Sequence, residues 1–574
     1  MADPILCEIV QNAFEMVAQE AGIRAARSAG SAFVTESDNV ACSLFDRHGR
    51  MIAKSSGGLS HVEALRWMLK EVLAQFPEAA LREGDTILSN SQFNGGIHPT
   101  DVGAFRPIFH EGRVAYWSAV MMLVGDLGGT CAGSLPANGT EIFHEGLILP
   151  PTKLYEGGVL NEGVMRIILG NSRTPGKLRT DIEALAGAGN VASLRIGELV
   201  GKYGAPLLTE IVEQMFDYSE RMTRAGVSAI PDGVYHASYF GDDDGIEPEK
   251  NFEVKVKITV AGSEITFDFT GSAPQAKGPT NSSYSQSVCF TVFTLRCYLP
   301  SDITANEGFF RPIKIILPEG TVVNPRYPAA CNIRFNTGLA IVDAINNALR
   351  PLFPDRSVAS SGSTCSFNVQ GRNPETGGMW STIDVIFGVG GARARSDAVD
   401  GLPFVMFSGA GYARNIEAYE IQYPLVYDFY RFEPDTGGPG TYRGSASLAK
   451  RVTFLEDGQL TTRGTGRFRL PPAGVEGGLP GAPGRYVLNE GTDCELRLPT
   501  MKTNHPLRAG DVLTGYCAAG GGYGDPRKRE PQRVLDDVRA GVVTREAARV
   551  TYGVVVNPEA TEVDVQATRL LRAN

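Results

Sequence analysis

A histidine and an aspartate three residues apart form the sharpest chemical motif in this sequence. His98 and Asp101 lie in the segment GGIHPTD, directly after the paired glycines Gly95 and Gly96. Glycines let a loop turn tightly and bring its backbone close to a ligand. Imidazole and carboxylate together suit a divalent cation such as zinc or manganese. The motif predicts a ligand loop, but taken alone it is explained more simply by a histidine that is hydrogen-bonded within an ordinary loop.

Three further residues could join such a site, and each also has a structural explanation. Asp126 follows an apolar stretch and precedes two glycines, so it is either a ligand or the residue that organises the loop through an Asx turn. Asp38 precedes a predicted hairpin and could cap a turn, while His61 opens a predicted helix. A last carboxylate–imidazole group consists of Glu141, His144 and Glu145. Glu145 followed by Gly146 is explained equally well by a turn.

Several common kinds of site are absent from the sequence. No GxSxG motif indicates a nucleophilic serine, and no GxxxxGK[ST] motif indicates a phosphate-binding loop. The net charge is −10 and no stretch combines dense Lys and Arg with aromatic residues, so nucleic acid is not an expected partner. No apolar run predicts a membrane span, and no signal peptide is recognised. The nine scattered cysteines form no CxxC pair, which favours reduced thiols and a cytoplasmic protein.

The spacing of apolar residues predicts the elements that must position these side chains. Helical periodicity is seen over 4–28, 61–76, 180–200, 205–226, 338–351 and two short pieces of 528–550 around Gly541. Alternating or continuous apolar runs predict a hairpin over 40–53 and short strands between Gly-rich loops over 85–160 and from 375 onward. A β-rich stretch is expected over 234–318, and it includes the apolar run 288–299.

These elements predict an α+β fold with several lobes, β-rich overall and with an N-terminal α/β portion. We expect residues 1–230 to form the N-terminal α/β lobe that carries the candidate site loops. Residues 231–375 are expected to form a β-rich middle lobe, and 376–574 a β-rich C-terminal lobe with terminal helices. The turn sequence Pro231-Asp232-Gly233 marks the first boundary.

Short motifs in a fixed order along the chain carry a family resemblance. They are ESD (36–38) with CSLFD (42–46), GGIHPTD (95–101), DLGGTCAGS (126–134), EG (145–146) before PP (150–151), NSRTP (171–175), FDFTGS (267–272), NEG (306–308), DTGGPGTYRG (435–444), GGGYGDP (520–526) and YGV (552–554). Each motif is modest, but the ordered set, from about residue 5 to residue 556, is specific. The chain resembles the hydantoinase B/5-oxoprolinase family.

The resemblance implies a division of labour between two subunits. An A-type partner binds ATP and phosphorylates the carbonyl oxygen of the substrate, which agrees with the missing phosphate-binding loop in this chain. The B-type subunit then carries the second half-reaction. In hydantoinases and oxoprolinases this is hydrolysis of the activated ring, and in acetone and acetophenone carboxylases it is carboxylation of the activated ketone.

The resemblance also implies a metal site, and this sequence departs from it. The positions that match the family's ligands are Asp38, His98, Asp101 and Asp126. The family's His-His-x-Asp motif reads Leu123-Val124-Gly125-Asp126, so both histidines are missing. Its Asn-Asp-Pro-Tyr motif reads Asn90-Ser91-Gln92-Phe93, which loses a carboxylate. Because a catalytic metal commonly needs about three protein ligands, the residues that persist could hold zinc or manganese only weakly.

We therefore expect the subunit of an ATP-dependent ketone carboxylase, with ATP on the partner and no cofactor bound by this chain. His98 is expected to act as the general base and Asp101 to orient it. A water-excluding pocket for an acetophenone-like ketone, to be joined to bicarbonate, is predicted from Phe93, Met122, Leu123, Val124 and His61. The alternatives are an ATP-dependent cyclic-amide hydrolase and a non-catalytic scaffold subunit. A small third subunit in the complex would point to a carboxylase.

Overall fold

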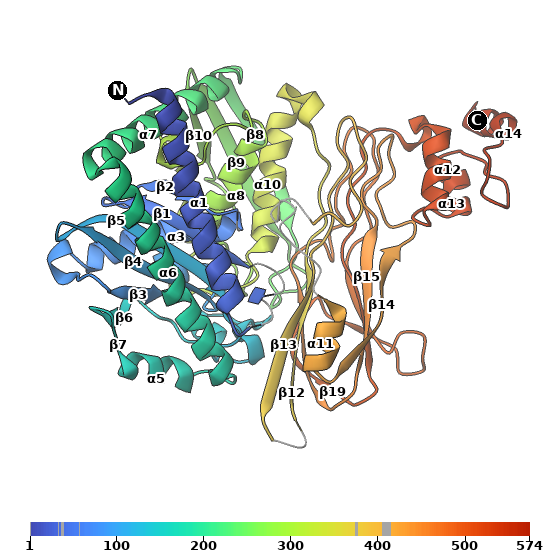
Figure 1. Cartoon of the computed structure of the whole chain (residues 1–574). Coiled ribbons are helices and arrows are strands. Elements are labelled where there is room, and N and C mark those ends of the chain that lie inside the picture. Colours follow the sequence, from blue (N-terminus) through green and yellow to red (C-terminus); the bar gives the residue numbers. More distant parts are fainter. Residues whose placement is uncertain are drawn as a thin grey trace. The chain divides into compact units, whose positions relative to one another are not determined.

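The computed structural model describes residues 2–31, 34–35, 39–56, 58–373, 377–403 and 415–573 (Figure 1). The predicted site residue Asp38 lies outside these ranges. The chain divides into two compact units. Unit 1 holds residues 1–238, 254–348 and 372–382, and unit 2 holds 239–253, 349–371 and 383–574. The three-lobe division expected from the sequence stays a prediction.

Unit 1 is built on a seven-stranded sheet of order β2-β1-β5-β4-β3-β6-β7. Neighbouring strands in this order pair in the antiparallel sense. The strands are β1 (Val40–Asp46), β2 (Met51–Lys54), β3 (Thr86–Ser89), β4 (Asp101–His110), β5 (Arg113–Leu123), β6 (Thr152–Glu156) and β7 (Val159–Leu160). The predicted hairpin over 40–53 is confirmed as β1 and β2, which are joined by a tight turn.

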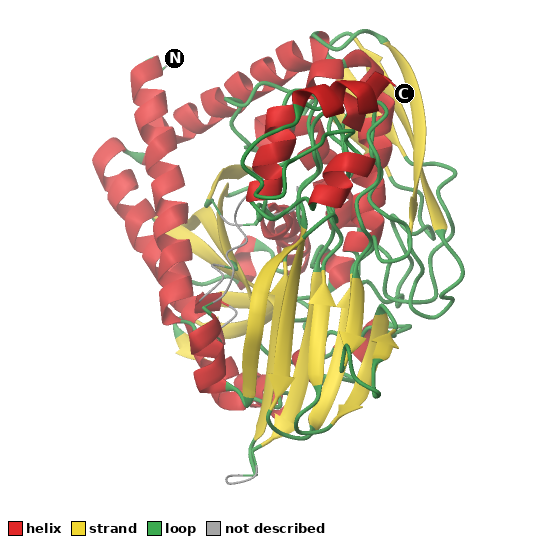
Figure 2. Cartoon of the chain, turned by 90° about the vertical axis from the view of Figure 1, so that its right-hand side faces the viewer, coloured by secondary structure: helices red, strands yellow, loops and turns green. Residues whose placement is uncertain are grey.

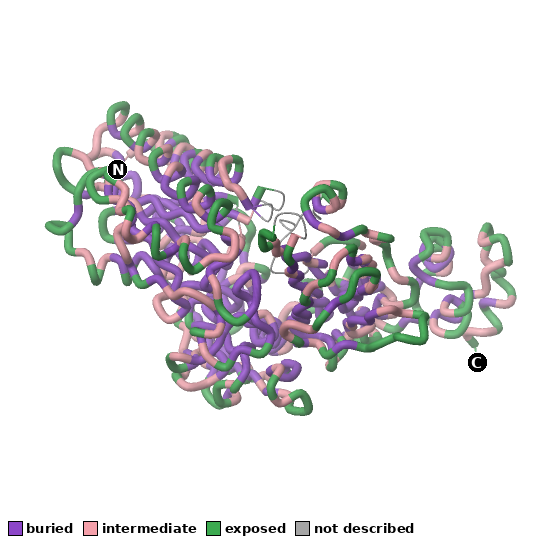
Figure 3. Tube along the Cα trace, turned by 90° about the horizontal axis from the view of Figure 1, so that it is seen from below, coloured by how far each residue is buried: buried purple, intermediate pink, exposed green. Residues whose placement is uncertain are grey.

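Helices cover both faces of this sheet. On one face lie α1 (Pro4–Ser28) and α6 (Pro175–Tyr203), and on the other lies α3 (Leu59–Gln75), which packs on α8 (Tyr284–Arg296) (Figure 1). Side chains alternate between the faces along a strand, so Met122 packs with the α1 and α6 residues and Met121 packs with α3. Buried residues follow the strands of the sheet in Figure 3, while the outer sides of the helices are exposed. The candidate site lies on the α3 face.

Five more helices and a second sheet lie between residues 142 and 349. The helices are α4 (Ile142–Glu145), α5 (Glu162–Gly170), α7 (Ala205–Ser228), α9 (Glu307–Phe310) and α10 (Phe335–Leu349). A four-stranded sheet of order β11-β10-β9-β8 contains β8 (Gly233–Gly241), β9 (Phe252–Ala261), β10 (Glu264–Asp268) and β11 (Ile313–Ile316). The predicted helices over 4–28, 61–76, 180–200, 205–226 and 338–351 are confirmed to within a few residues.

The expectation that the apolar run 288–299 belongs to a β-rich stretch is wrong. The run lies mostly in helix α8, where every residue from Ser285 to Leu295 except Phe293 is buried. A helix that is buried on all sides needs no polar face, so its sequence shows no helical periodicity. A short apolar run of this kind cannot be distinguished from a buried strand by pattern alone.

Two further sheets, of order β13-β12-β16-β19 and β14-β15-β20-β17-β18, belong mostly to unit 2 (Figure 2). Their strands are β12 (Cys365–Arg372), β13 (Met379–Ile386), β14 (Leu425–Glu433), β15 (Ser447–Phe454), β16 (Gly458–Gly464), β17 (Arg485–Leu488), β18 (Leu496–Leu498), β19 (Met501–Leu507) and β20 (Val512–Tyr516). Its helices are α11 (Ile416–Gln422), α12 (Pro531–Arg539), α13 (Arg545–Val550) and α14 (Val565–Ala573). Both units mix helices and sheets, which confirms the α+β class. No helix in the described ranges is long and apolar enough to cross a bilayer.

The late glycine-rich motifs of the sequence form one layer of backbone packing in unit 2. Gly438 donates to the Gly520 carbonyl at 2.8 Å, and Gly520 donates to the Ser445 carbonyl at 3.0 Å. A Cβ on Gly520 would clash with the carbonyl of Gly390, and one on Gly444 would clash with that of Gly520. These glycines are required because peptide groups pack directly against one another, and no ligand is needed to explain the motifs.

The segment Asn306-Glu307-Gly308 also has a packing role. Asn306 caps α9 by accepting from the Gly308 amide at 3.0 Å, and Glu307 pairs with Arg66 at 2.9 Å. A Cβ on Gly308 would clash with the backbone oxygen of Phe216 in α7. The glycine is therefore needed for the close approach of α9 to α7.

Replacing Gly308 by alanine is expected to lower the free energy of unfolding by about 3 kcal/mol, because backbone must move to admit the methyl group. Urea unfolding of the full chain measures the change. The matched control is Gly187→Ala in α6, where the new Cβ meets no atom within 4 Å. That control is expected to stabilise the helix by roughly 0.5–1 kcal/mol. A Gly308→Ala protein as stable as the control would contradict the packing argument.

Candidate functional site

Two histidines share the carboxylate of Asp101 on the α3 face of the sheet. Asp101 begins β4 and is 2% exposed. Its Oδ2 lies 2.5 Å from Nδ1 of His98, and its Oδ1 lies 3.0 Å from Nε2 of His61 in α3. The loop is closed by a hydrogen bond from the Asp101 amide to the His98 carbonyl at 3.0 Å. The structure thus brings together His98, Asp101 and His61, three of the residues singled out in the sequence.

The two imidazoles keep Asp101 ionised. Burial by itself would raise the pKa of the Asp101 carboxyl, but the interactions with His98 and His61 outweigh burial and hold this pKa well below its usual range. Asp101 is therefore a carboxylate at every pH near neutrality, and it can stabilise positive charge on His98.

Arg334, just before α10, contacts the other nitrogen of His98. Its Nη1 lies against Nε2 of His98, while its Nε donates to Oε1 of Gln286 at 2.9 Å. Gln286 in turn donates to the Ser60 carbonyl at 3.2 Å. A guanidinium only donates hydrogen bonds, so Nε2 of His98 is the acceptor and Nδ1 carries the proton that faces Asp101. Sequence analysis missed Arg334 because a single arginine before a predicted helix belongs to no recognisable pattern.

Glu145 supports the segment that leads to Arg334. Its carboxylate is fully buried and accepts from the amides of Cys331 and Asn332 at 2.9 and 3.0 Å and from the side chain of Gln92. The rest of the predicted carboxylate–imidazole group is separate from it. His144 is partly exposed and faces Glu141 at 4.0 Å. Glu145 therefore supports the site, and the side-chain amide of Gln92 helps to hold its carboxylate in place.

The carboxylate of Asp126 is fully hydrogen-bonded by its own loop and by Arg173. Its Oδ1 accepts from the amides of Gly128 at 3.2 Å and Arg173 at 2.8 Å. Its Oδ2 accepts from the Gly133 amide at 2.9 Å and from Nη1 of Arg173 at 3.0 Å. Four donors fill the acceptor sites of the two oxygens. The Asx-turn interpretation describes Asp126, and the motifs DLGGTCAGS and NSRTP meet at this carboxylate.

The model of the hydantoinase B/oxoprolinase family matches residues 3–526. The chain belongs to the hydantoinase B/oxoprolinase family.

Three relatives span nearly the whole chain. It is 31% identical to a protein of Pseudomonas sp. strain NS671 that is described as the B-type subunit of a D-/L-hydantoinase, over 99% of this chain and 98% of the relative. It is 25% identical to the delta subunit of acetophenone carboxylase from Aromatoleum aromaticum, over 92% of this chain and 82% of the relative. The solved structure of the ATP-dependent caprolactamase from Pseudomonas jessenii has a TM-score of 0.91, with 26% identity and 100% of both chains covered.

The predicted apolar pocket of this hydantoinase B family member is divided between the two faces of the sheet. Met122 and Val124 belong to the core beneath α1 and α6, away from Asp101. Leu123 is the cross-strand partner of Asp101 and shares its face. The ring of Phe93 packs edge-on against Tyr327 with centroids 5.5 Å apart. His61 and Leu123 adjoin Asp101, whereas Met122 and Val124 stabilise the fold.

The described residues do not fit a zinc or manganese ion as arranged here. They contain no group of three or more His, Cys, Asp and Glu side chains that could hold a metal. Both nitrogens of His98 are engaged, and one of them faces the cation Arg334. Asp126 has no acceptor site left, and Asp38 lies outside the described residues. The ligand set that the family resemblance implies is therefore not assembled among the described side chains.

The site region also holds buried polar atoms that have no hydrogen-bond partner among the residues the structure describes. They include Nδ1 of His61, Oε1 of Gln92 and Oγ1 of Thr100. Buried polar atoms are usually paired, so unpaired ones mark places where water or a polar ligand binds. His61 places one such atom in the ring that contacts Asp101.

Proposed function

We propose that this chain is the B-type subunit of an ATP-dependent, cytoplasmic two-component enzyme. It carries the step that follows phosphorylation of the substrate on an A-type partner. Two of its relatives are named as subunits, and the caprolactamase is named as ATP-dependent. The sequence contains no phosphate-binding loop motif, which supports a separate ATP-binding subunit.

In this proposal His98 acts as the general base, and Arg334 stabilises negative charge on the substrate. Nε2 of His98 carries a lone pair, and the substrate replaces Arg334 at this atom on binding. His98 then accepts on Nε2 a proton from the group that it activates, the attacking water in a hydrolysis, and Asp101 stabilises the resulting imidazolium through Nδ1. Arg334, released from His98 and still oriented by Gln286, stabilises the oxyanion or phosphate that develops.

We further propose that the substrate is a cyclic amide, such as a hydantoin or a lactam, which is opened by water. The observation that supports this choice is the buried Nδ1 of His61, which has no hydrogen-bond partner among the described residues and lies in the same ring that contacts Asp101. A hydrolytic step needs a bound and oriented water, whereas carboxylation of an enol benefits from a dry site. The relatives named for a hydantoinase and a caprolactamase support the same choice.

Ketone carboxylation is the second candidate, and one observation favours it. Leu123 lies beside Asp101, at a position where the family resemblance implies an imidazole. An aliphatic side chain there would help to exclude water from an activated aromatic ketone and its bicarbonate-derived partner. The acetophenone carboxylase delta subunit is the relative that supports this candidate.

The deciding experiment uses the chain purified together with its A-type partner and any small third subunit. With ATP, ring opening of hydantoin or caprolactam is followed by chromatography, and fixation of labelled bicarbonate onto acetophenone is followed by acid-stable radioactivity. Ring opening supports the first candidate, and fixation without ring opening replaces it with the second. Activity that is unaffected by changes at His98 would leave only a scaffold role for this chain.

A further inference from the structure

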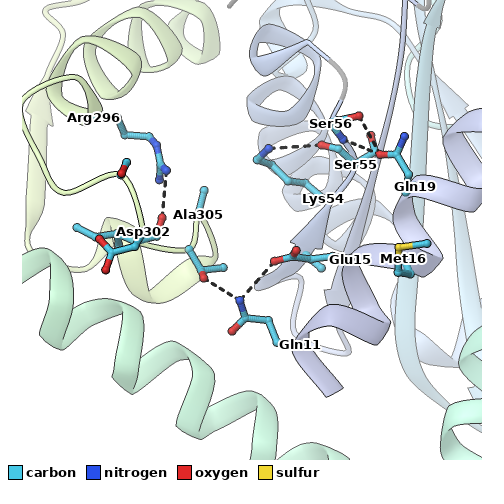
Figure 4. Close-up of a pocket in the computed structure, with 14 residues that line it drawn as sticks. Gln11, Glu15, Met16, Gln19, Lys54, Ser55, Ser56, Arg296, Asp302 and Ala305 are labelled. Carbon is cyan, nitrogen blue, oxygen red and sulfur yellow. Dashed lines mark hydrogen bonds between the residues drawn. The ribbon is translucent and has the colours of Figure 1, made fainter. Parts of the chain in front are cut away.

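A cavity of about 530 Å³ lies in unit 1, and its lining does not include the residues that carry the proposed reaction. Its walls come from α1, the end of β2, the end of α8 and the loop 301–305 (Figure 4). A volume of this size is typical of small-molecule sites, which span about 300–1,000 Å³. Neither His98, Asp101 nor Arg334 lines this cavity.

Two cations extend into the cavity from opposite walls, Lys54 from the end of β2 and Arg296 from α8 (Figure 4). Nζ of Lys54 reaches only the carbonyl of the adjacent Ser55, at 3.4 Å. Arg296 donates through Nη2 to the Ile303 carbonyl at 3.0 Å, while its buried Nη1 has no partner. In the described part of the chain, no carboxylate lies within ion-pair distance of either cation. This is unusual, because buried or half-buried cations are normally paired.

The surroundings of the cavity disfavour the charged forms of Lys54 and Arg296. Burial lowers the pKa of Lys54, and the nearby charge of Arg296 lowers it further, while Glu15 partly opposes them. Burial also lowers the pKa of Arg296. Glu15 and Asp302 line the same cavity, but Glu15 accepts from Gln11 at 3.4 Å and does not pair with either cation. An anion between Lys54 and Arg296 would relieve both penalties.

We infer that this cavity is a binding site for a small organic oxyanion, whose carboxylate or phosphate group is held between Lys54 and Arg296. The guanidinium of Arg296 offers its unpaired Nη1, and Lys54 adds a second positive charge, a combination that suits either group. The cavity is larger than a bare anion requires, so the ligand carries an organic body. The two carboxylates on its wall, Glu15 and Asp302, favour a ligand of low total negative charge.

The test measures binding of two probes to the full-length chain by isothermal titration calorimetry, with inorganic phosphate in one arm and glutarate in the other. Wild type is expected to bind at least one probe. Lys54→Gln and Arg296→Gln are each expected to weaken that binding by about tenfold or more, the loss typical of a charge-assisted contact. Matched controls remove exposed charges outside the cavity, Arg24→Gln and Lys314→Gln, and are expected to bind as wild type does.

A third variant separates loss of charge from loss of structure. Lys54→Arg keeps the positive charge and is expected to retain binding, with a thermal midpoint close to that of wild type. Binding of phosphate alone would assign the ligand's group as a phosphate, and binding of glutarate alone as a carboxylate. The inference is overturned if neither probe binds wild type, or if the two glutamine variants bind as tightly as the controls. The assay needs neither ATP nor a partner, so its outcome is independent of the proposed reaction.

Discussion

His98→Ala is expected to lower kcat of the assembled enzyme by about 10²- to 10⁴-fold, the usual loss when a general base is removed. The reason is geometric. His98 is the residue that joins the ionised Asp101 on one side to Arg334 on the other, and Nε2 is the atom proposed to take the proton. Single-turnover kinetics with the A-type partner and ATP measures the effect on the second half-reaction separately from phosphorylation.

The control for this experiment is His110→Ala, because His110 is partly exposed at the end of β4 and pairs loosely with Glu111 at 3.9 Å. It is expected to leave kcat unchanged. ATP consumption by the partner should persist in the His98 variant, since phosphorylation precedes the proton transfer. If the variant retains wild-type turnover in product formation, His98 is a structural residue and the mechanism proposed above is wrong.

Asp126→Asn is expected to lower the free energy of unfolding by about 3–5 kcal/mol, the range seen when one partner of a buried ion pair is removed. Asp126 is fully buried and meets four N–H donors, two of them from Arg173. An asparagine keeps one acceptor oxygen and turns an NH₂ group toward donors that then lack a partner. Denaturation in urea gives the change as a lower midpoint at a similar slope.

Asp217→Asn is the matched control, since Asp217 is an exposed carboxylate that pairs with Arg311 at the surface. Exposed ion pairs contribute about 0–1 kcal/mol, so its midpoint should move little. A shift at Asp126 no larger than that of the control would show that the carboxylate is dispensable for the loop, and would reopen its assignment as a ligand.

Much of the fold could be predicted from local pattern. The helix α1 and the hairpin of β1 and β2 follow from apolar spacing and a turn, and the short helices α12 and α13 follow from their charged, amphipathic sequence. The helix α8 could not be predicted, because burial on every side removes the periodicity on which such an assignment depends. Gly520 and Gly444 could be recognised as special, but only the fold shows that they pack against each other.

The site could be predicted only where its residues are close in sequence. His98 and Asp101 are three residues apart and meet in one turn. His61, Arg334 and Glu145 reach the same place through pairing that spans 40 to 236 positions of the chain, as for His61 with Asp101 and Arg334 with His98. Contacts between residues so far apart in the sequence leave no pattern in the residues around either partner. The turn interpretation of Asp126, one of the two that the sequence motif left open, describes its geometry, whereas the family resemblance implies a ligand.

Side chains alternate between the two faces of the sheet at the end of β5, so positions 123 and 124 differ in whether they can accept a histidine. A histidine at 123 would lie beside Asp101 on the α3 face, where its imidazole could pair with the carboxylate. A histidine at 124 would enter the core beneath α1 and α6, where a buried polar group without a partner costs about 1–3 kcal/mol. Position 123 could therefore accept an imidazole that pairs with Asp101, whereas position 124 requires an apolar side chain.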